Sequence, residues 1–125
     1  MATAIVVEDD ASMRYMLQST LGLAGHEVLA AVDSGAEALK YLKAGQVPDI
    51  VFLDMILPGG LGSEIIGYIR EHHKGVKIFM VTGLTEKQIL GLVPPGGCDD
   101  IIYKPFGVPE LMRRVERLLA PQEPG

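Results

Sequence analysis

The chain has 125 residues, of which 48% are hydrophobic and 22% are charged, and its formal net charge is -5. This length suits about one domain with a buried core, and the composition excludes a disordered chain. The acidic charge argues against non-specific binding to nucleic acid or to an anionic membrane. No apolar run approaches the roughly 18 residues of a membrane helix, and the first residues lack the basic stretch of a signal peptide. We therefore expect a cytoplasmic protein.

The first part of the chain alternates short apolar runs with an amphipathic stretch. Thr3–Val7 is apolar without polar alternation, which is typical of a strand buried on both faces. A helix with apolar residues at helical spacing follows, and Gly22 and Gly25 weaken and end it. We predict a second strand at His26–Val32.

The middle of the chain contains a capping signal and a third apolar run. Ser34, with Glu37 three residues later, is typical of a capping box and predicts a second helix that runs to Gly45. The third strand is predicted at Asp49–Leu53. It places Asp54 at its carboxyl end.

Glycine and proline divide the next part of the chain. Leu57–Gly60 contains the sequence Pro-Gly-Gly, which predicts a loop. A third helix is expected around Ile65–Ile69 and should end near Lys74–Gly75. The fourth strand is predicted at Val76–Val81, directly before a threonine.

The last part of the chain completes the pattern. A weak helix at Thr85–Leu92 is stopped by Pro94–Gly97, and a fifth strand is predicted at Asp100–Tyr103. The last helix is predicted at Pro109–Leu119, because proline is tolerated in a first helical turn. Pro121–Gly125 has the composition of a tail or a truncated linker.

Strand and helix thus alternate five times along the chain. This alternation predicts one α/β domain, residues 1–120, with a doubly wound parallel sheet and helices on both faces. In such folds ligands bind outside the carboxyl ends of the strands. The reactive side chains that follow predicted strands are Glu8, Asp9, Asp10, Asp54, Thr82 and Lys104.

This set of side chains contains the groups that phosphoryl transfer requires. Carboxylates that lie close together raise one another's pKa or recruit a cation, and Mg²⁺ prefers carboxylate oxygens, water and phosphate as ligands. Lys104 offers a second positive charge, and the Thr82 hydroxyl can hydrogen-bond an incoming oxygen. Nucleophile, metal ligands, cation and positioning donor are then all present.

Four motifs at these strand ends occur in the order that is typical of one family. They are Val7-Glu8-Asp9-Asp10, Asp54 with Pro58 and Gly62, Val81-Thr82-Gly83, and Tyr103-Lys104-Pro105-Phe106. Together they resemble the receiver domain of two-component response regulators, from Thr3 to about Leu119. The resemblance implies a five-stranded sheet with the flavodoxin-like strand order 2-1-3-4-5, for which the chemotaxis regulator is the reference example.

The resemblance also implies a role for each reactive residue. Asp54 would be the phosphoacceptor, the Thr82 hydroxyl would move toward the phosphoryl group, and Lys104 would pair with it. The implied Mg²⁺ ligands are Glu8, Asp9, Asp54 and the backbone carbonyl of Ile56. The implied phosphoryl donor is a phosphohistidine on a histidine kinase or a histidine phosphotransfer protein. The implied output is contact with a downstream protein or domain, with a possible homodimer and no turnover of outside substrates.

Several positions depart from the usual family pattern. Ile101 stands where many receivers have an aromatic ring that swings inward, so this coupling between threonine and ring is not expected here. Ile56 and Leu84 should border the phosphoryl group and hinder the hydrolytic water. Glu8 is longer than the aspartate that is frequent at its position, and Pro94–Pro95 alters the end of the fourth helix.

Other polar residues are expected to have structural roles. His26 is predicted in a loop, and the adjacent His72 and His73 point apart on a helix, so none is expected to bind metal. Cys98 is expected to be a small packed residue. A solvated face of the last helix is predicted for Arg113, Arg114, Glu116 and Arg117.

Three other functions compete with a phosphorylation switch. A flavodoxin-like electron carrier would need a phosphate loop where Glu8-Asp9-Asp10 stands, and these acids would repel a flavin phosphate. An aspartyl phosphatase would carry a second aspartate where Ile56 stands. The third alternative is a degenerate receiver that binds partners without phosphorylation, which the absence of a ring at Ile101 keeps open.

Overall fold

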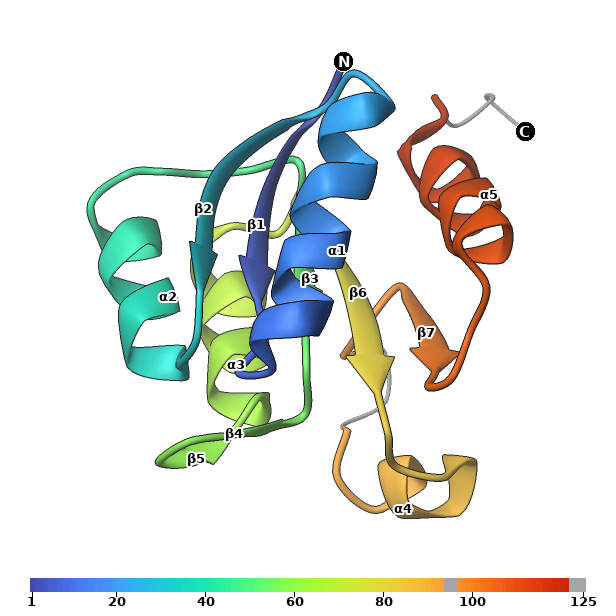
Figure 1. The fold of residues 1–125 in the computed structure, drawn as a ribbon. Coiled ribbons are helices and arrows are strands. Elements are labelled where there is room, and N and C mark those ends of the chain that lie inside the picture. The colour runs from blue at the N-terminus through green and yellow to red at the C-terminus, as the bar shows by residue number, and fades with distance from the viewer. Residues whose placement is uncertain (94–96, 122–125) are drawn as a thin grey trace.

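A twisted parallel sheet lies at the centre of the molecule, with helices packed on both of its faces (Figure 1). The structure is a computed structural model and describes residues 1–93 and 97–121. The strands of the central sheet are β1 (Thr3–Val7), β2 (Glu27–Val32), β3 (Ile50–Leu53), β6 (Lys77–Thr82) and β7 (Asp100–Tyr103). The helices are α1 (Ala11–Leu23), α2 (Gly35–Lys43), α3 (Ser63–His72), α4 (Glu86–Leu90) and α5 (Val108–Leu119).

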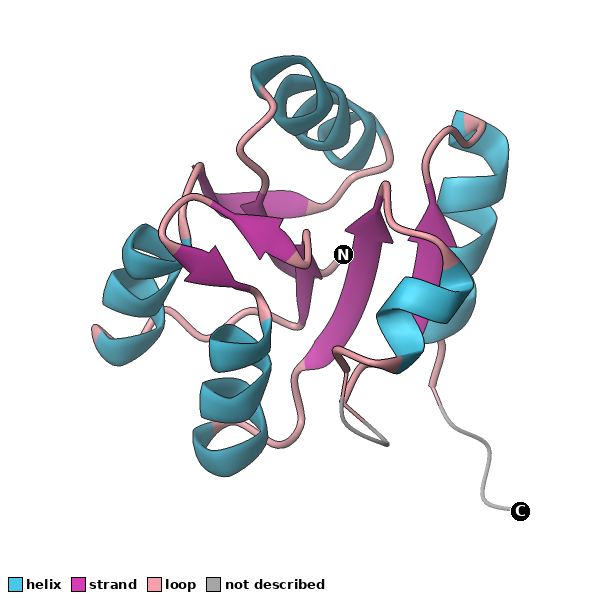
Figure 2. Ribbon diagram, turned by 90° about the horizontal axis from the view of Figure 1, so that it is seen from below, coloured by secondary structure: helices cyan, strands magenta, loops and turns pink. Residues whose placement is uncertain are grey.

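The order of the sheet is β2-β1-β3-β6-β7, and each neighbouring pair is parallel. The predicted order 2-1-3-4-5 of a doubly wound α/β fold is therefore confirmed. Successive strand residues point to opposite faces, so each face of the sheet has its own apolar core. Viewed from the end to which the strands point, the sheet is a layer between helices (Figure 2).

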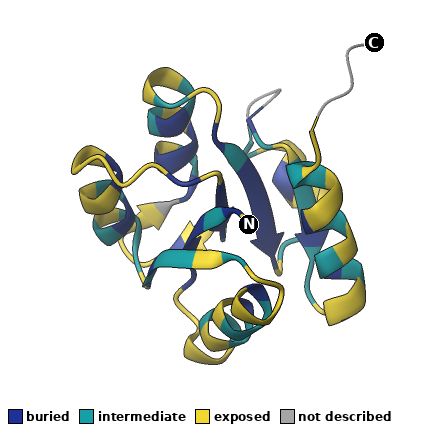
Figure 3. Ribbon diagram, turned by 90° about the horizontal axis from the view of Figure 1, so that it is seen from above, coloured by how far each residue is buried: buried dark blue, intermediate teal, exposed yellow. Residues whose placement is uncertain are grey.

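Two apolar clusters hold these layers together. On one face, Leu17 of α1 and Val115 of α5 pack with strand residues such as Phe52. On the other face, α2, α3 and α4 pack their apolar residues, such as Ile66, against the sheet. The inner strands β1, β3 and β6 are almost entirely buried, whereas the edge strands β2 and β7 are only partly buried and the helices turn one side to solvent (Figure 3). The uninterrupted apolar strands of the sequence are thus explained by burial on both sides.

The structure corrects several predicted boundaries. The segment predicted as a plain loop contains a small antiparallel hairpin of β4 (Ile56–Leu57) and β5 (Gly60–Leu61). Two-residue strands give too short a pattern to be recognised in a sequence. Strand β2 begins at Glu27 rather than at His26, and α4 is limited to Glu86–Leu90. The predicted stop at Pro94–Gly97 lies largely outside the described residues, as do residues 122–125 of the predicted tail.

The start of α4 is capped by its own side chains. Thr85 caps the helix in a capping box with Gln88, in which each side chain accepts a hydrogen bond from the other residue's backbone.

None of the helices in the described part of the chain has the length and apolar character that a bilayer crossing requires.

Candidate functional site

The strands of the central sheet point toward its lower edge in Figure 1, and the reactive residues predicted at strand ends stand at or directly after these ends in the sequence. Backbone hydrogen bonds continue the sheet pattern just beyond the strands and fix these residues. The N–H of Glu8 donates to the carbonyl of Val32 at 3.0 Å, and the N–H of Asp54 donates to Val7 at 3.2 Å. The N–H of Lys104 donates to the carbonyl of Thr82 at 2.7 Å.

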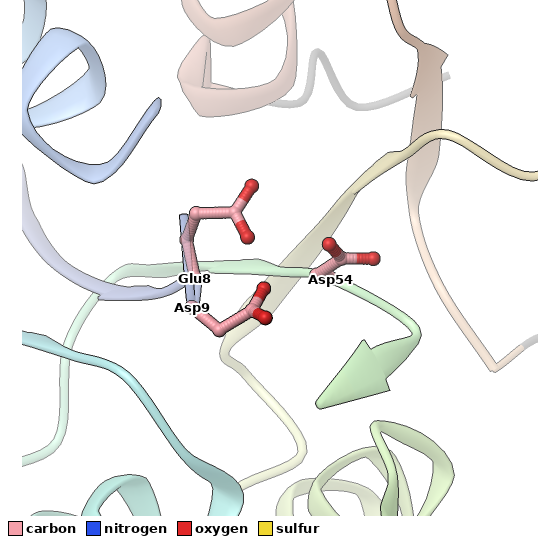
Figure 4. Close-up of side chains that lie close together, drawn as sticks. All are labelled: Glu8, Asp9 and Asp54. Carbon is pink, nitrogen blue, oxygen red and sulfur yellow. The ribbon is translucent and has the colours of Figure 1, made fainter. Parts of the chain in front are cut away.

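Three carboxylates meet at this edge. One carboxylate oxygen from each of Glu8, Asp9 and Asp54 lies within 4.8 Å of the others. Glu8 is buried, Asp54 is half-buried and Asp9 is exposed, and the close-up shows the side chains of Glu8 and Asp9 turned toward Asp54 (Figure 4). Such a set of hard oxygen donors, partly open to water, fits the coordination that Mg²⁺ prefers.

Lys104 reaches this cluster from β7. Its ammonium nitrogen lies 2.6 Å from Glu8 Oε1 and 3.3 Å from Asp54 Oδ2. Burial raises the pKa of Glu8 above its ordinary value, although the hydrogen bond and charge of Lys104 act in the opposite direction. Burial also opposes the charge on Lys104, but its bonds to Glu8 and Asp54 outweigh this effect, so the pKa of Lys104 is raised. Lys104 therefore stays an ammonium between two carboxylates.

Thr82 lies at the end of β6 and is fully buried. Its hydroxyl oxygen accepts a hydrogen bond from the backbone N–H of Leu84 at 3.1 Å. This bond fixes the turn that leads into α4 and leaves the hydroxyl proton for another acceptor. Within the described residues, the structure shows no hydrogen bond from the Thr82 side chain to Asp54 or Lys104.

The two apolar residues expected beside the phosphoryl group differ in their surroundings. Ile56 is 52% exposed, and its backbone N–H lies 3.4 Å from Asp54 Oδ1. Leu84 is half-buried and packs against the apolar cluster between the sheet and helices α2, α3 and α4. The side chain of Ile56 is thus the more exposed of the two.

Asp10, the third acid after β1, caps α1. Its side chain accepts hydrogen bonds from the backbone N–H groups of Ser12 and Met13.

Two residues of the site have contacts that the sequence did not predict. An atom placed as Cβ on Gly62 would lie 2.6 Å from the backbone oxygen of Asp54, so a side chain cannot fit there without moving one of the two segments. Arg14 Nη1 donates to the backbone carbonyl of Glu8 at 2.8 Å. Gly62 belongs to a recognised motif, but neither contact has a signal in the spacing of the sequence.

The last helix is less solvated than predicted. Arg114 Nη1 donates to the carbonyl of Ile101 at 2.7 Å and lies 3.3 Å from Asp100 Oδ1. The prediction of a solvated Arg114 is therefore wrong, since the Asp100 carboxylate and the carbonyl of Ile101 hold its side chain against β7. Arg113 is exposed as predicted. His26 lies just before β2, outside the strand, and its Nε2 is 2.8 Å from Glu116 Oε1.

Comparison with known proteins identifies the family. Residues 4–116 match the family model described as the response regulator receiver domain. The chain belongs to this family. It is 37% identical over 115 residues to the DNA-binding response regulator MtrA of Mycolicibacterium paratuberculosis, an alignment that covers 92% of this chain and 50% of MtrA. It is 36% identical over 121 residues to PhoP of Bacillus subtilis, the alkaline phosphatase synthesis transcriptional regulatory protein, covering 95% of this chain and 49% of PhoP.

Solved structures give the same result for the receiver domain. The response regulator TrrA of Thermotoga maritima, solved with Mg²⁺ and BeF, superposes with a TM-score of 0.83 at 33% identity, covering 95% of this chain and all (100%) of TrrA. A LuxR-family response regulator of Staphylococcus aureus superposes with a TM-score of 0.84 at 26% identity, covering 94% of this chain and 98% of that one. This receiver spans about half the length of the curated relatives it matches.

Proposed function

We propose that this receiver is a phosphorylation-dependent switch, in which Asp54 accepts a phosphoryl group from a phosphohistidine of a histidine kinase or a histidine phosphotransfer protein. The observation that carries the proposal is the position of the Asp54 carboxylate directly after the carboxyl end of β3. It lies 3.3 Å from the Lys104 ammonium and clusters with two further carboxylates, those of Glu8 and Asp9. This arrangement provides a nucleophile, a fixed cation and oxygen donors for a metal.

The chain's own residues divide the chemistry among them. A carboxylate oxygen of Asp54 forms the new bond to phosphorus, while the bond from phosphorus to the donor's imidazole nitrogen breaks and the imidazole leaves. The proposed ligands Glu8, Asp9, Asp54 and the Ile56 carbonyl would hold Mg²⁺, which when bound neutralises charge on the phosphoryl oxygens. Lys104 is already placed to bind a phosphoryl oxygen through its ammonium group.

Thr82 and Ile101 connect this reaction to the output. If the Thr82 side chain rotates so that its hydroxyl oxygen moves toward the phosphoryl group, this oxygen leaves the N–H of Leu84, and the turn before α4 is released. Ile101 has no ring to follow this movement, so the change travels through the turn and α4 instead. The domain promotes its own phosphotransfer and autodephosphorylation and does not turn over outside substrates.

Labelling by a small acyl phosphate tests the proposal. We expect the protein with Mg²⁺ and the donor to gain one phosphoryl group, seen by intact mass, because the carboxylate needs only an activated phosphorus. Asp54→Ala should abolish the gain. Asp33→Ala, which removes an exposed carboxylate at the end of β2, should leave it unchanged. A gain that survives Asp54→Ala would overturn the assignment.

The second candidate is a receiver that binds partners without phosphorylation, and Ile101 is the observation in its favour. A folded protein that takes no phosphoryl group under these conditions would support it. In both cases we propose that residues 1–120 are the receiver and that residues 121–125 lead toward a further domain or form a tail. The output partner would then be a downstream protein or domain, reached in the cytoplasm by contact and without nucleic acid binding by this domain.

Ile56 should control the lifetime of the phosphorylated state. Its backbone N–H lies 3.4 Å from Asp54 Oδ1 and its side chain is 52% exposed, so we infer that this side chain can exclude the water that hydrolyses the acyl phosphate. We expect Ile56→Asn to shorten the lifetime of phospho-Asp54 severalfold, because the amide can hydrogen-bond and orient that water. Ile56→Val keeps an apolar surface and should change the lifetime little. A lifetime in Ile56→Asn that is equal to or longer than that of the wild type would contradict this role.

A further inference from the structure

The acidic turn after β1 is held in place from α1 by Arg14. Arg14 Nη1 donates to the carbonyl of Glu8 at 2.8 Å and lies 3.5 Å from the carbonyl of Asp9. On the other side, the N–H of Glu8 donates to Val32 of β2. The peptide groups on both sides of Glu8 are therefore fixed, one by the sheet and one by the guanidinium group.

Arg14 is itself anchored within the same turn. Its backbone N–H donates to the carbonyl of Asp10 at 2.9 Å, and the Asp10 side chain caps the start of α1. The chain thus leaves β1, turns through the three acids and enters the helix, from which the half-buried Arg14 side chain reaches back to the start of the turn. This closed arrangement restricts the backbone that carries the exposed Asp9.

We propose that Arg14 is a positioning residue for the metal site, which directs the carboxylates of Glu8 and Asp9 toward Asp54 by fixing their backbone. The proposal rests on the proposed role of these acids as Mg²⁺ ligands. Groups that orient metal ligands typically contribute about 10-fold to 100-fold to metal affinity. Asp9 depends on such help most, because it is exposed and lies on a turn rather than within a strand.

Electrostatics alone predicts the opposite effect. A guanidinium group beside an acidic cluster repels a divalent cation, so removing its charge should tighten Mg²⁺ binding. Removing a positioning group should weaken binding. The direction of the change therefore distinguishes a positioning role from that of a mere neighbouring charge.

The test is to titrate the full chain with MgCl₂ alone and to measure the Kd by isothermal titration calorimetry. We expect Arg14→Gln to raise the Kd for Mg²⁺ about 10-fold. Arg14→Lys keeps the charge but lacks the planar fork, so it should recover only part of the affinity. Arg113→Gln removes an exposed charge on α5 and should bind as the wild type does. At saturating Mg²⁺, acyl phosphate should label Arg113→Gln as completely as the wild type, because Asp54 and Lys104 are intact.

Each outcome bears on the proposal. Mg²⁺ binding by a folded Arg14→Gln, checked by far-UV circular dichroism, that equals or exceeds that of the wild type would overturn the positioning role and leave the phosphorylation switch standing. If Arg14→Gln does not fold, a folded Arg14→Lys with wild-type affinity overturns it equally. A wild-type protein that binds no Mg²⁺, or binds it unchanged after Asp9→Asn, would overturn both this inference and the metal site on which it rests.

Discussion

Replacing Lys104 by methionine is expected to lower the free energy of unfolding at neutral pH by about 2 kcal/mol, because it leaves a buried carboxylate without its cation. Glu8 is only 2% exposed and is 2.6 Å from the Lys104 ammonium. The estimate is below that for a fully buried pair because the Lys104 side chain is 22% exposed. The same variant should be labelled by acyl phosphate about 100-fold more slowly, since a fixed charge on the phosphoryl group is lost.

The loss of stability in Lys104→Met should depend on pH with a definite sign. Burial already raises the pKa of Glu8 in the folded protein, and removal of the ammonium raises that pKa further. A carboxyl group with a raised folded pKa favours folding when it is protonated, below its unfolded pKa, and this contribution is lost as pH rises through the folded pKa. The gap between variant and wild type should therefore be small near about pH 5 and larger near about pH 8.

Urea unfolding at these two pH values measures the effect. Lys40→Met is the matched control, because Lys40 forms a 3.0 Å pair with Glu37 on the surface of α2, where both side chains are well exposed. Such a surface pair should contribute less than about 1 kcal/mol, with little change between the two pH values. A gap for Lys104→Met that shrinks as pH rises would contradict the further rise of the Glu8 pKa in this variant.

The carboxyl ends of the strands could be located from the sequence, and with them most of the site. Buried parallel strands give uninterrupted apolar runs, and the residue after each run must lie at one common edge of the sheet. Asp54, Thr82 and Lys104 follow three such runs directly. The sheet order was predictable as well, because the motifs at these ends belong to one family whose match covers residues 4–116.

Side-chain contacts between distant parts of the chain could not be predicted from the sequence pattern. Lys104 binds Glu8 across 96 positions, and only the folded sheet determines that it reaches Glu8 as well as Asp54. Arg114 illustrates the same limit, because a charged residue on an exposed helix gives no sign that a strand carbonyl lies within reach. The hairpin of β4 and β5 was missed because two residues cannot show a strand period.

Gly62 makes a contact of this kind at the functional site, because it packs against the backbone of Asp54. We expect Gly62→Ala to destabilise the protein by about 1–3 kcal/mol, because the new methyl group would lie 2.6 Å from the backbone oxygen of Asp54 and must displace one of the two segments. We also expect phosphorylation of Asp54 to slow by about 100-fold, since a displacement of about 1 Å in a reacting group can have this effect. Thermal unfolding and timed acyl phosphate labelling measure the two changes.

Gly67→Ala, in the helix α3 that follows Gly62, is the matched control. Gly67 is exposed in the middle of α3, and no atom lies within 4 Å of the position of an added Cβ. Alanine is favoured over glycine by about 1 kcal/mol inside a helix, so this variant should be more stable than the wild type and should be labelled at the same rate. If Gly62→Ala were labelled as fast as Gly67→Ala, the segment around Gly62 would be able to move away from Asp54 without disturbing the Asp54 carboxylate. The rate of phosphorylation would then depend on the side chains around Asp54 rather than on the close packing of its backbone.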